Sequence, residues 1–156
     1  MFVVEVETGQ KHEIIVELVD SSDFGKLTKK RYFFNWKEEK SQELYKLRRV
    51  DHSDILGVVS FERIPSEWRI HIRLLSVSVE NKGKEKQFDH IIGNLIAFVA
   101  RQALKDYAEM GCVSLIPKSK LAQHYMDKYG MQQTGMTLSV ELPEMLNLLT
   151  RYGYEK

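Results

Sequence analysis

Apolar residues alternate with polar ones, or run together over short stretches, along the first half of the chain. This pattern predicts strands, and the turn residues TGQK between the first two suit a strand pair or two separate short strands. The stretch 20–30 is polar and suits a loop or a short helix. The predicted strands cover residues 2–6, 13–19, 32–36, 43–50, 55–64 and 68–79.

The segment 68–79 is the longest predicted strand, and its two halves differ. In the first half the apolar face carries Trp68, Ile70 and Ile72, and the polar face carries Arg69, His71 and Arg73. Such alternation is typical of a sheet with one solvated face. The second half, LLSVSV, has little polar character, so we expect burial on both sides there, or cover by a helix or a ligand.

The apolar period changes to that of a helix at Phe88. Apolar residues then recur at three- and four-residue steps as far as Met110, with Asp89 as a cap or first-turn acid and Gly111 as the stop. A strand at 112–116, a helix at 120–129, a strand at 136–142 and a helix at 144–152 follow. The order predicts an α+β domain over residues 1–156, with a single mixed, mostly antiparallel central sheet flanked by helices.

Composition and charge exclude several classes of protein. The chain has 156 residues, of which 43% are hydrophobic, enough for one domain with one sizeable core. Its 23 basic and 22 acidic residues nearly cancel, so we expect no general nucleic-acid binding, and lysine clusters at 26–30 and 82–86 support only a weaker, local contact. The longest apolar run, at 91–100, is too short to span a membrane.

The cysteine and histidine content points to an ordinary intracellular protein. Cys112 is the only cysteine, which excludes an intrachain disulfide and favours a cytoplasmic setting, with the thiol as a small buried apolar group. The five histidines are scattered without metal-ligand spacing, so we expect no metal site. The first ten residues lack a positive leader with a long apolar stretch, so we expect no signal peptide.

The junction from Val79 to Gly93 is the first candidate site. A predicted strand ends there, a polar loop with Lys82, Lys84 and Lys86 follows, and a long helix begins. The start of a helix offers free N–H groups and a positive dipole end, which favour a phosphate or pyrophosphate. A solvated lysine-rich loop is the plainer alternative. A pantetheine-like chain could pair with free backbone groups beside the next strand, as an added strand would.

Three stretches between residues 55 and 135 resemble the GNAT family of N-acetyltransferases. ILGVVSFERI resembles a core strand of that family, and LLSVSVENKGKEKQFDHIIGNLIAFVA resembles its strand, pyrophosphate loop and following helix. SKLAQHYMDKYGM resembles its late motif, in which an Asn, an Ala, a Tyr and a Gly-Phe pair recur. Ser119, Ala122, Tyr125 and the pair Gly130-Met131 stand at those offsets, with Ser for Asn and Met for Phe.

The resemblance implies acetyl-CoA as the cofactor and transfer of its acetyl group to an amine. Tyr125 would protonate the departing thiolate, and Glu80 or Glu62 would help to deprotonate the amine. The backbone near Val77 and Val79 would pair with the pantetheine arm, and the loop and helix start would hold the pyrophosphate. The implied cofactor-binding residues are Val77, Val79, Gln87, His90, Ile91, Ile92, Gly93 and Ser119.

The chain also departs from the family pattern. With Gln87 first in the loop motif, His90 and Ile92 stand where small residues are usual, and Gly93 comes one residue late. A non-catalytic binding module on the same fold is therefore the alternative function. Tyr125 has an alternative as well, because it shares a helix face with Leu121 and Tyr129 and would then be a packed core aromatic.

The acceptor amine stays open. Residues 1–50 form a divergent, β-rich part, whereas the family usually places there the two helices that shape the acceptor pocket. A small molecule, a protein or an aminoacyl-tRNA are the candidate acceptors, and pairing of two chains through a sheet edge into a homodimer is compatible with the sequence.

Overall fold

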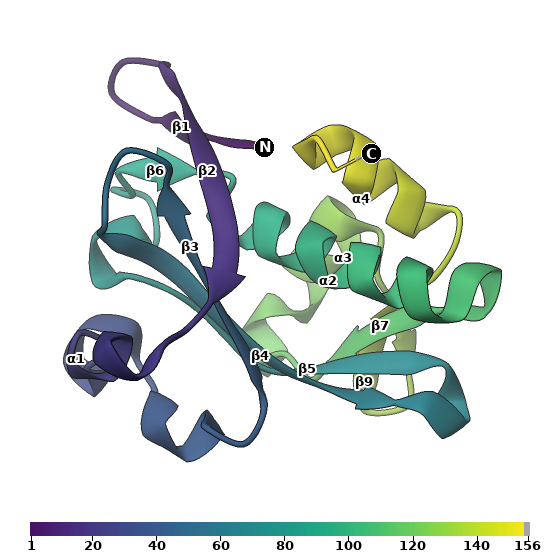
Figure 1. Cartoon of the computed structure of the whole chain (residues 1–156). Helices are drawn as coiled ribbons and strands as arrows, with labels where there is room; N and C mark the ends of the chain where they lie inside the picture. Colours follow the sequence, from purple (N-terminus) through teal and green to yellow (C-terminus); the bar gives the residue numbers. More distant parts are fainter. Residues whose placement is uncertain (155–156) are drawn as a thin grey trace. The chain divides into compact units, whose positions relative to one another are not determined.

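The computed structural model describes residues 1–154, and Figure 1 shows the order of their helices and strands. The chain folds into two compact units. Unit 1 consists of Met1–Phe61 and Leu74–Leu95, and unit 2 of Glu62–Arg73 and the chain from Ile96 onward. Three elements contribute residues to both units: β4 (Ile55–Ile64), β5 (Arg69–Val77) and α2 (Ile91–Tyr107).

The described strands form one mixed sheet in the order β6-β1-β2-β3-β4-β5-β7-β9-β8. Strands β5 and β7 are parallel, whereas β6, β1, β2, β3 and β4 pair antiparallel in turn, as do β7, β9 and β8. This topology confirms the predicted α+β class. The remaining strands are β1 (Phe2–Glu5), β2 (Lys11–Leu18), β3 (Glu43–Arg49), β6 (Phe88–Asp89), β7 (Cys112–Leu115), β8 (Gln132–Thr134) and β9 (Thr137–Val140).

Helix α2 confirms the predicted apolar stripe but begins three residues later than predicted. Leu95, Ile96, Val99 and the alanines between and after them are fully buried. Phe88 belongs instead to β6, which pairs with β1. The prediction failed because Phe88 continues the helical period by chance, while its backbone completes the edge of the sheet. The helix ends at Tyr107, and a 3-10 turn carries the chain to Gly111.

The prediction of a strand at 32–36 is wrong. Helix α1 (Lys29–Tyr32) is capped by Thr28 and ends where Phe33 adopts a left-handed backbone, and a 3-10 turn begins at Trp36. The hydroxyl of Tyr32 donates to the Ile55 carbonyl at 2.6 Å, and the Trp36 indole donates to the Tyr32 carbonyl at 3.0 Å. Tyr32 and Trp36 are thus buried at helical i, i+4 spacing, which a run of β-forming aromatic residues does not reveal.

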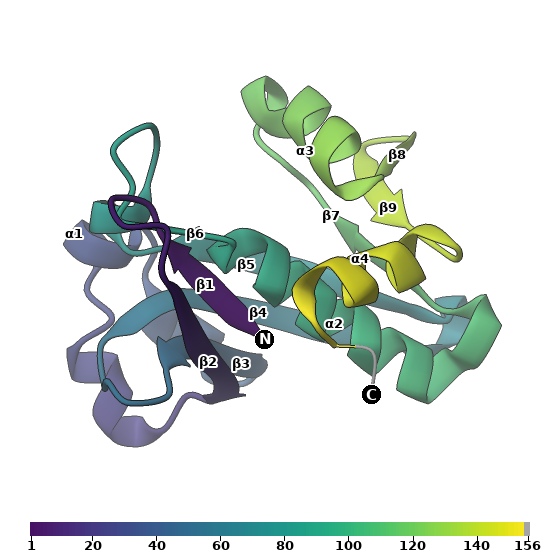
Figure 2. The same ribbon diagram turned by 90° about the horizontal axis from the view of Figure 1, so that it is seen from above.

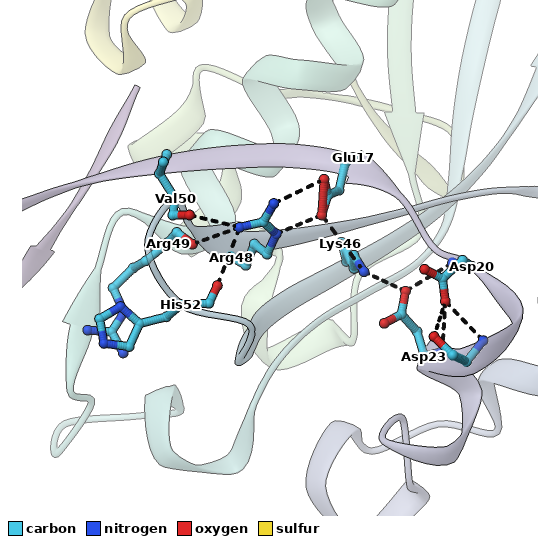
Figure 3. A network of polar contacts seen from close by, with 9 residues as sticks. Glu17, Asp20, Asp23, Lys46, Arg48, Arg49, Val50 and His52 are labelled. Atoms are coloured by element: carbon cyan, nitrogen blue, oxygen red, sulfur yellow. Dashed lines mark hydrogen bonds and ion pairs between the residues drawn. The ribbon is translucent and has the colours of Figure 1, made fainter.

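A buried ion pair anchors the chain between β2 and α1 (Figure 3). Nζ of Lys46, on β3, lies 2.6 Å from a carboxylate oxygen of Asp23, and both side chains are almost fully buried. Asp23 also forms a capping box with Asp20 at the 3-10 turn Ser21–Gly25. Beside them Glu17 of β2 pairs with Arg48 of β3 at 2.7 Å. These contacts hold the polar segment that was predicted as a loop or short helix, and so fix where α1 begins.

Unit 2 contains the two remaining helices, α3 (Ala122–Tyr129) and α4 (Glu144–Tyr152), and both confirm the sequence prediction. Figure 2 shows α3 beside β9. Strand β8 was not predicted, because Gln132–Thr134 is polar and exposed throughout and so has no alternating pattern. Within residues 1–154, no helix has the length and apolar character needed to cross a membrane.

Two side chains in unit 2 differ from their predicted environments. Trp68 does not share the buried face of Ile70 and Ile72, because it ends the turn Pro65–Glu67 with a left-handed backbone and is 50% exposed. Cys112 is half-buried rather than buried. Burial nevertheless raises the pKa of its thiol, which keeps it in the less reactive neutral form.

Candidate functional site

The predicted cofactor loop lies in unit 1 and is closed by Asn81. Strand β5 ends at Val77, and Val79 begins a 3-10 turn that ends at Asn81. The buried Asn81 amide donates to Oγ of Ser78 at 2.8 Å, and its carbonyl oxygen accepts from the Phe88 N–H at 2.8 Å. Asn81 thereby joins the two ends of the loop. The sequence carried no signal for this role, since an asparagine in a polar loop is ordinary.

Strand β6 ties the end of this loop to the first strand. Its pairing joins Glu5 to Phe88, and the N–H of Val6 donates to the Gln87 carbonyl at 2.9 Å. The N–H of Gln87 in turn donates to the Glu80 carbonyl at 3.2 Å. Both backbone groups of Gln87 therefore form hydrogen bonds within the chain. Only its side chain remains for contact with a ligand.

The three loop lysines differ in their surroundings. Lys82 and Lys84 are exposed, and the ammonium of Lys82 lies 4.3 Å from the ring centre of Phe33. Lys86 pairs with Asp89 at 3.1 Å. The loop therefore keeps positive charge at its surface, and one end of it rests on the segment that follows α1.

His90 has a left-handed backbone, with a φ of 77°, immediately before α2. Its N–H donates to the Asp89 side chain at 2.8 Å, and its carbonyl accepts the N–H of Asn94 at 3.1 Å. His90 stands where the resemblance places a glycine, and it adopts the conformation that glycine favours. The next three N–H groups, of Ile91, Ile92 and Gly93, have no acceptor inside the helix and form its positive end.

Glu80, the predicted proton acceptor, is held by an arginine. Its carboxylate oxygens lie 3.0 Å and 3.3 Å from Nε of Arg31. Burial alone would raise the pKa of Glu80, but hydrogen bonds from its own backbone N–H and from Arg31 outweigh burial and hold the pKa below its usual value. The second candidate, Glu62, pairs with Arg73 at 2.9 Å. Both carboxylates are thus engaged by an arginine.

Tyr125, the predicted acid, lies on α3 in unit 2 and is half-buried. Its ring centre lies 5.6 Å from that of Tyr129, which is only 3% exposed and so belongs to the core. Burial raises the pKa of Tyr125 above the ordinary value. Its hydroxyl is therefore protonated near neutral pH, and none of the side chains that the structure describes forms a hydrogen bond with it.

The other residues of the late motif flank this helix. Gly130 ends α3 with a φ of 70°, which accounts for a glycine at that position. Met131 is buried. Ser119 lies in the 3-10 turn before α3, and its side chain is outside the part of the chain that the structure describes.

His71 and Ser114 form a polar contact in unit 2 that the sequence did not single out. The Ser114 hydroxyl lies 2.8 Å from Nδ1 of His71 and 2.7 Å from Nη1 of Arg69. Because a guanidinium only donates, the hydroxyl donates to the neutral imidazole. Burial, and after it the charge of Arg69, lowers the pKa of His71. Ser114 is fully buried, so the contact fixes β5 to β7 rather than exposing a nucleophile.

Comparisons by sequence and by structure differ sharply. No family model and no curated protein matches the sequence. A chimera of the spermidine N-acetyltransferase SpeG from Vibrio cholerae and hSSAT matches the structure with a TM-score of 0.65 at 10% identity, over 86% of this chain and 99% of that one. The ribosomal-protein-S18-alanine N-acetyltransferase from Escherichia coli matches with a TM-score of 0.62 at 6% identity, over 83% and 94%.

A third solved structure holds coenzyme A. The N-acetylglutamate synthase from Neisseria gonorrhoeae, complexed with coenzyme A and L-arginine, matches with a TM-score of 0.63 at 10% identity. The match covers 86% of this chain and 34% of that longer one. The TM-scores establish a shared fold. At identities this low they do not establish a shared activity, which must be argued from the residues.

Proposed function

We propose, from the GNAT fold that this chain shares with those acetyltransferases, that it transfers an acetyl group from acetyl-CoA to an amine. The fold carries the proposal, because it extends over most of the chain and over nearly the whole of the first two proteins compared. Those two are named for acetylation of spermidine and of an alanine of a ribosomal protein, and the third for synthesis of N-acetylglutamate. The acceptor here is an amine of a small molecule, a protein or an aminoacyl-tRNA.

The residues at the start of α2 suit the diphosphate of coenzyme A. The N–H groups of Ile91, Ile92 and Gly93 lie at the positive end of a 17-residue helix, and the side chain of Gln87 and the backbone at His90 precede them. Lys82 and Lys84 add mobile positive charge. Together these groups favour a dianion over a neutral ligand. We assign the pantetheine arm to the backbone at Val77 and Val79, and a further cofactor contact to Ser119.

The chemistry requires one proton acceptor and one proton donor. Bound acetyl-CoA supplies a thioester carbonyl that an amine can attack, with the carbon–sulfur bond then breaking. We assign Glu80 to receive the proton of the amine, directly or through a water molecule. We assign Tyr125 to donate its phenolic proton to the sulfur as it leaves, a role that suits a hydroxyl that stays protonated near neutral pH.

Calorimetric titration of the purified protein with acetyl-CoA tests the proposal. We expect a Kd on the order of 10 µM, about −7 kcal/mol. Desulfo-coenzyme A should bind with similar affinity, and ADP more weakly, because the pyrophosphate is only part of the ligand. Absence of heat up to about 1 mM acetyl-CoA would contradict the proposed function. Binding would justify a screen of amines by release of free coenzyme A.

A second candidate function is a binding module that has lost efficient use of coenzyme A. The engaged backbone of Gln87 and the bulky His90 favour it, because both reduce the close backbone approach that a pyrophosphate needs. A folded protein that ignores acetyl-CoA but retains a specific protein partner in a pull-down would support this alternative.

The variant His90→Gly tests whether the loop limits cofactor affinity. We expect acetyl-CoA to bind about threefold to tenfold tighter, a gain of about 1 kcal/mol, because the imidazole is removed and glycine keeps the φ of 77° without strain. His90→Ala is the matched control. It also removes the imidazole but leaves a Cβ on a left-handed backbone, so it should be less stable than His90→Gly by about 1 kcal/mol. Weaker or unchanged binding by His90→Gly would argue against this site.

A further inference from the structure

Arg31 joins two carboxylates that lie far apart in the sequence. Its Nε faces Glu80 at 3.0 Å, and its Nη2 lies 2.9 Å from a carboxylate oxygen of Asp54. All three side chains are partly exposed, between 32% and 43%. A single exposed ion pair contributes little, but two carboxylates on different nitrogens of one guanidinium fix its orientation.

The backbone at Arg31 is held by its buried neighbour. The Tyr32 hydroxyl donates to the Ile55 carbonyl, and the Tyr32 carbonyl accepts from both the Trp36 indole and Oγ of Ser76 at 3.0 Å. Helix α1 is thus fastened to β4 and β5 within unit 1. Arg31, one residue before Tyr32 in this helix, is therefore presented to Glu80 by a rigid support rather than by a mobile loop.

We propose that Arg31 is a positioning residue that fixes the Glu80 carboxylate in one orientation and keeps it negatively charged. This inference rests on the proposed acetyl transfer, in which Glu80 receives the proton of the amine. Asp54 pairs with a second nitrogen of the guanidinium, so the position of Arg31 does not depend on Glu80 alone. Lys82, stacked on Phe33, adds a second contact between the α1 segment and the loop.

The effect of removing Arg31 on the pKa of Glu80 follows from the interactions that act on this carboxyl group. Burial acts to raise its pKa, and the hydrogen bonds from its own N–H and from Arg31 act to lower it. Without Arg31, fewer hydrogen bonds counteract the effect of burial, so the pKa of Glu80 should rise. The other titratable groups near it are Asp54, which pairs with Arg31, and the Tyr32 phenol, whose pKa burial raises far out of the working range.

The experiment compares the wild type with Arg31→Gln, Arg31→Lys and a control, Arg48→Gln. The control removes an arginine that pairs with Glu17 at 2.7 Å in the same unit but lies on β3. The Glu80 carboxyl is titrated by carbon-13 NMR, identified with Glu80→Gln, and acetyl transfer is measured against pH. Arg31→Gln should raise the pKa of Glu80, shift the acid limb of kcat to higher pH and lower kcat about tenfold near neutrality through misplacement.

The control and conservative variants separate positioning from general loss of structure. Arg48→Gln should leave the pKa of Glu80 and the acid limb unchanged, and Arg31→Lys should restore part of both by keeping the charge. An unchanged pKa of Glu80 in Arg31→Gln, or an equal shift in Arg48→Gln, would overturn the proposal. Because the NMR titration needs no substrate, it judges Arg31 even if the wild type neither binds nor uses acetyl-CoA, a result that would refute the proposed function separately.

Discussion

Replacing Tyr125 with Phe is expected to lower kcat about a hundredfold, because the leaving thiolate loses its proton donor. The Kd for acetyl-CoA should stay within about twofold, since only one oxygen atom is removed. The ring of Tyr125 packs beside that of Tyr129, and phenylalanine preserves this packing, so the free energy of unfolding should change little. Single-turnover kinetics across pH, with calorimetry for the Kd, provide the measurement.

The pH dependence of kcat distinguishes proton donation by Tyr125 from a role in packing alone. Burial raises the pKa of Tyr125, so the hydroxyl stays protonated to higher pH than an exposed tyrosine, and the basic limb that it causes should lie above the ordinary tyrosine range. Tyr125→Phe should remove that limb. Tyr129→Phe, on the same helix but in the core, is the matched control and should keep kcat within about twofold. Equal losses in both variants would show that the tyrosines serve packing alone.

Much of the fold could be predicted because long periodic segments determine their own structure. The stripe of α2 and the apolar run of β4 each extend over ten or more residues, so that a single deviating residue does not hide the pattern. The short helix with Tyr125 was also predicted, and Gly130 marked its end correctly. The resemblance to the GNAT family, drawn from these segments, is confirmed at the level of the fold.

The errors occurred where tertiary contacts decide the local structure. The aromatic run 32–36 has high strand propensity, yet a hydrogen bond from the Tyr32 hydroxyl to the distant Ile55 carbonyl and a local one from the Trp36 indole to the Tyr32 carbonyl stabilise a helical turn. Phe88 belongs to β6 because β1 supplies a partner from the other end of the sequence. No local pattern reveals the bond of Tyr32 to Ile55 or the pairing of β6 with β1.

The candidate site could be predicted only as a set of residues, not as a set of interactions. Glu80 was selected by its place at the end of a strand, but its partner Arg31 lies 49 positions earlier in the sequence. The roles of Val77, Val79, Gln87 and Ser119 stay predictions. His90 was identified as a departure from a glycine position, and its left-handed backbone supplies the physical reason why a glycine suits that place.

Gly57→Leu should have the largest effect on both stability and cofactor binding in unit 1. A Cβ atom at Gly57 would lie 2.6 Å from Cγ2 of Ile91 and 3.0 Å from Cδ1 of Leu95, so the first turn of α2 rests directly on β4. A larger side chain must push that turn away. We expect the free energy of unfolding to fall by about 3 kcal/mol, as measured by denaturant unfolding.

The same displacement should weaken acetyl-CoA binding at least tenfold, since the N–H groups at the start of α2 would no longer lie where the pyrophosphate needs them. Gly57→Ala should show both effects in smaller measure, because it adds only the Cβ atom, which at 2.6 Å from Cγ2 of Ile91 still requires a shift. Gly25→Leu is the control, as no atom lies within 4 Å of a Cβ there. If folded Gly57→Leu protein bound acetyl-CoA as tightly as the wild type, the cofactor would not depend on the start of α2, and the loop lysines would have to hold it instead.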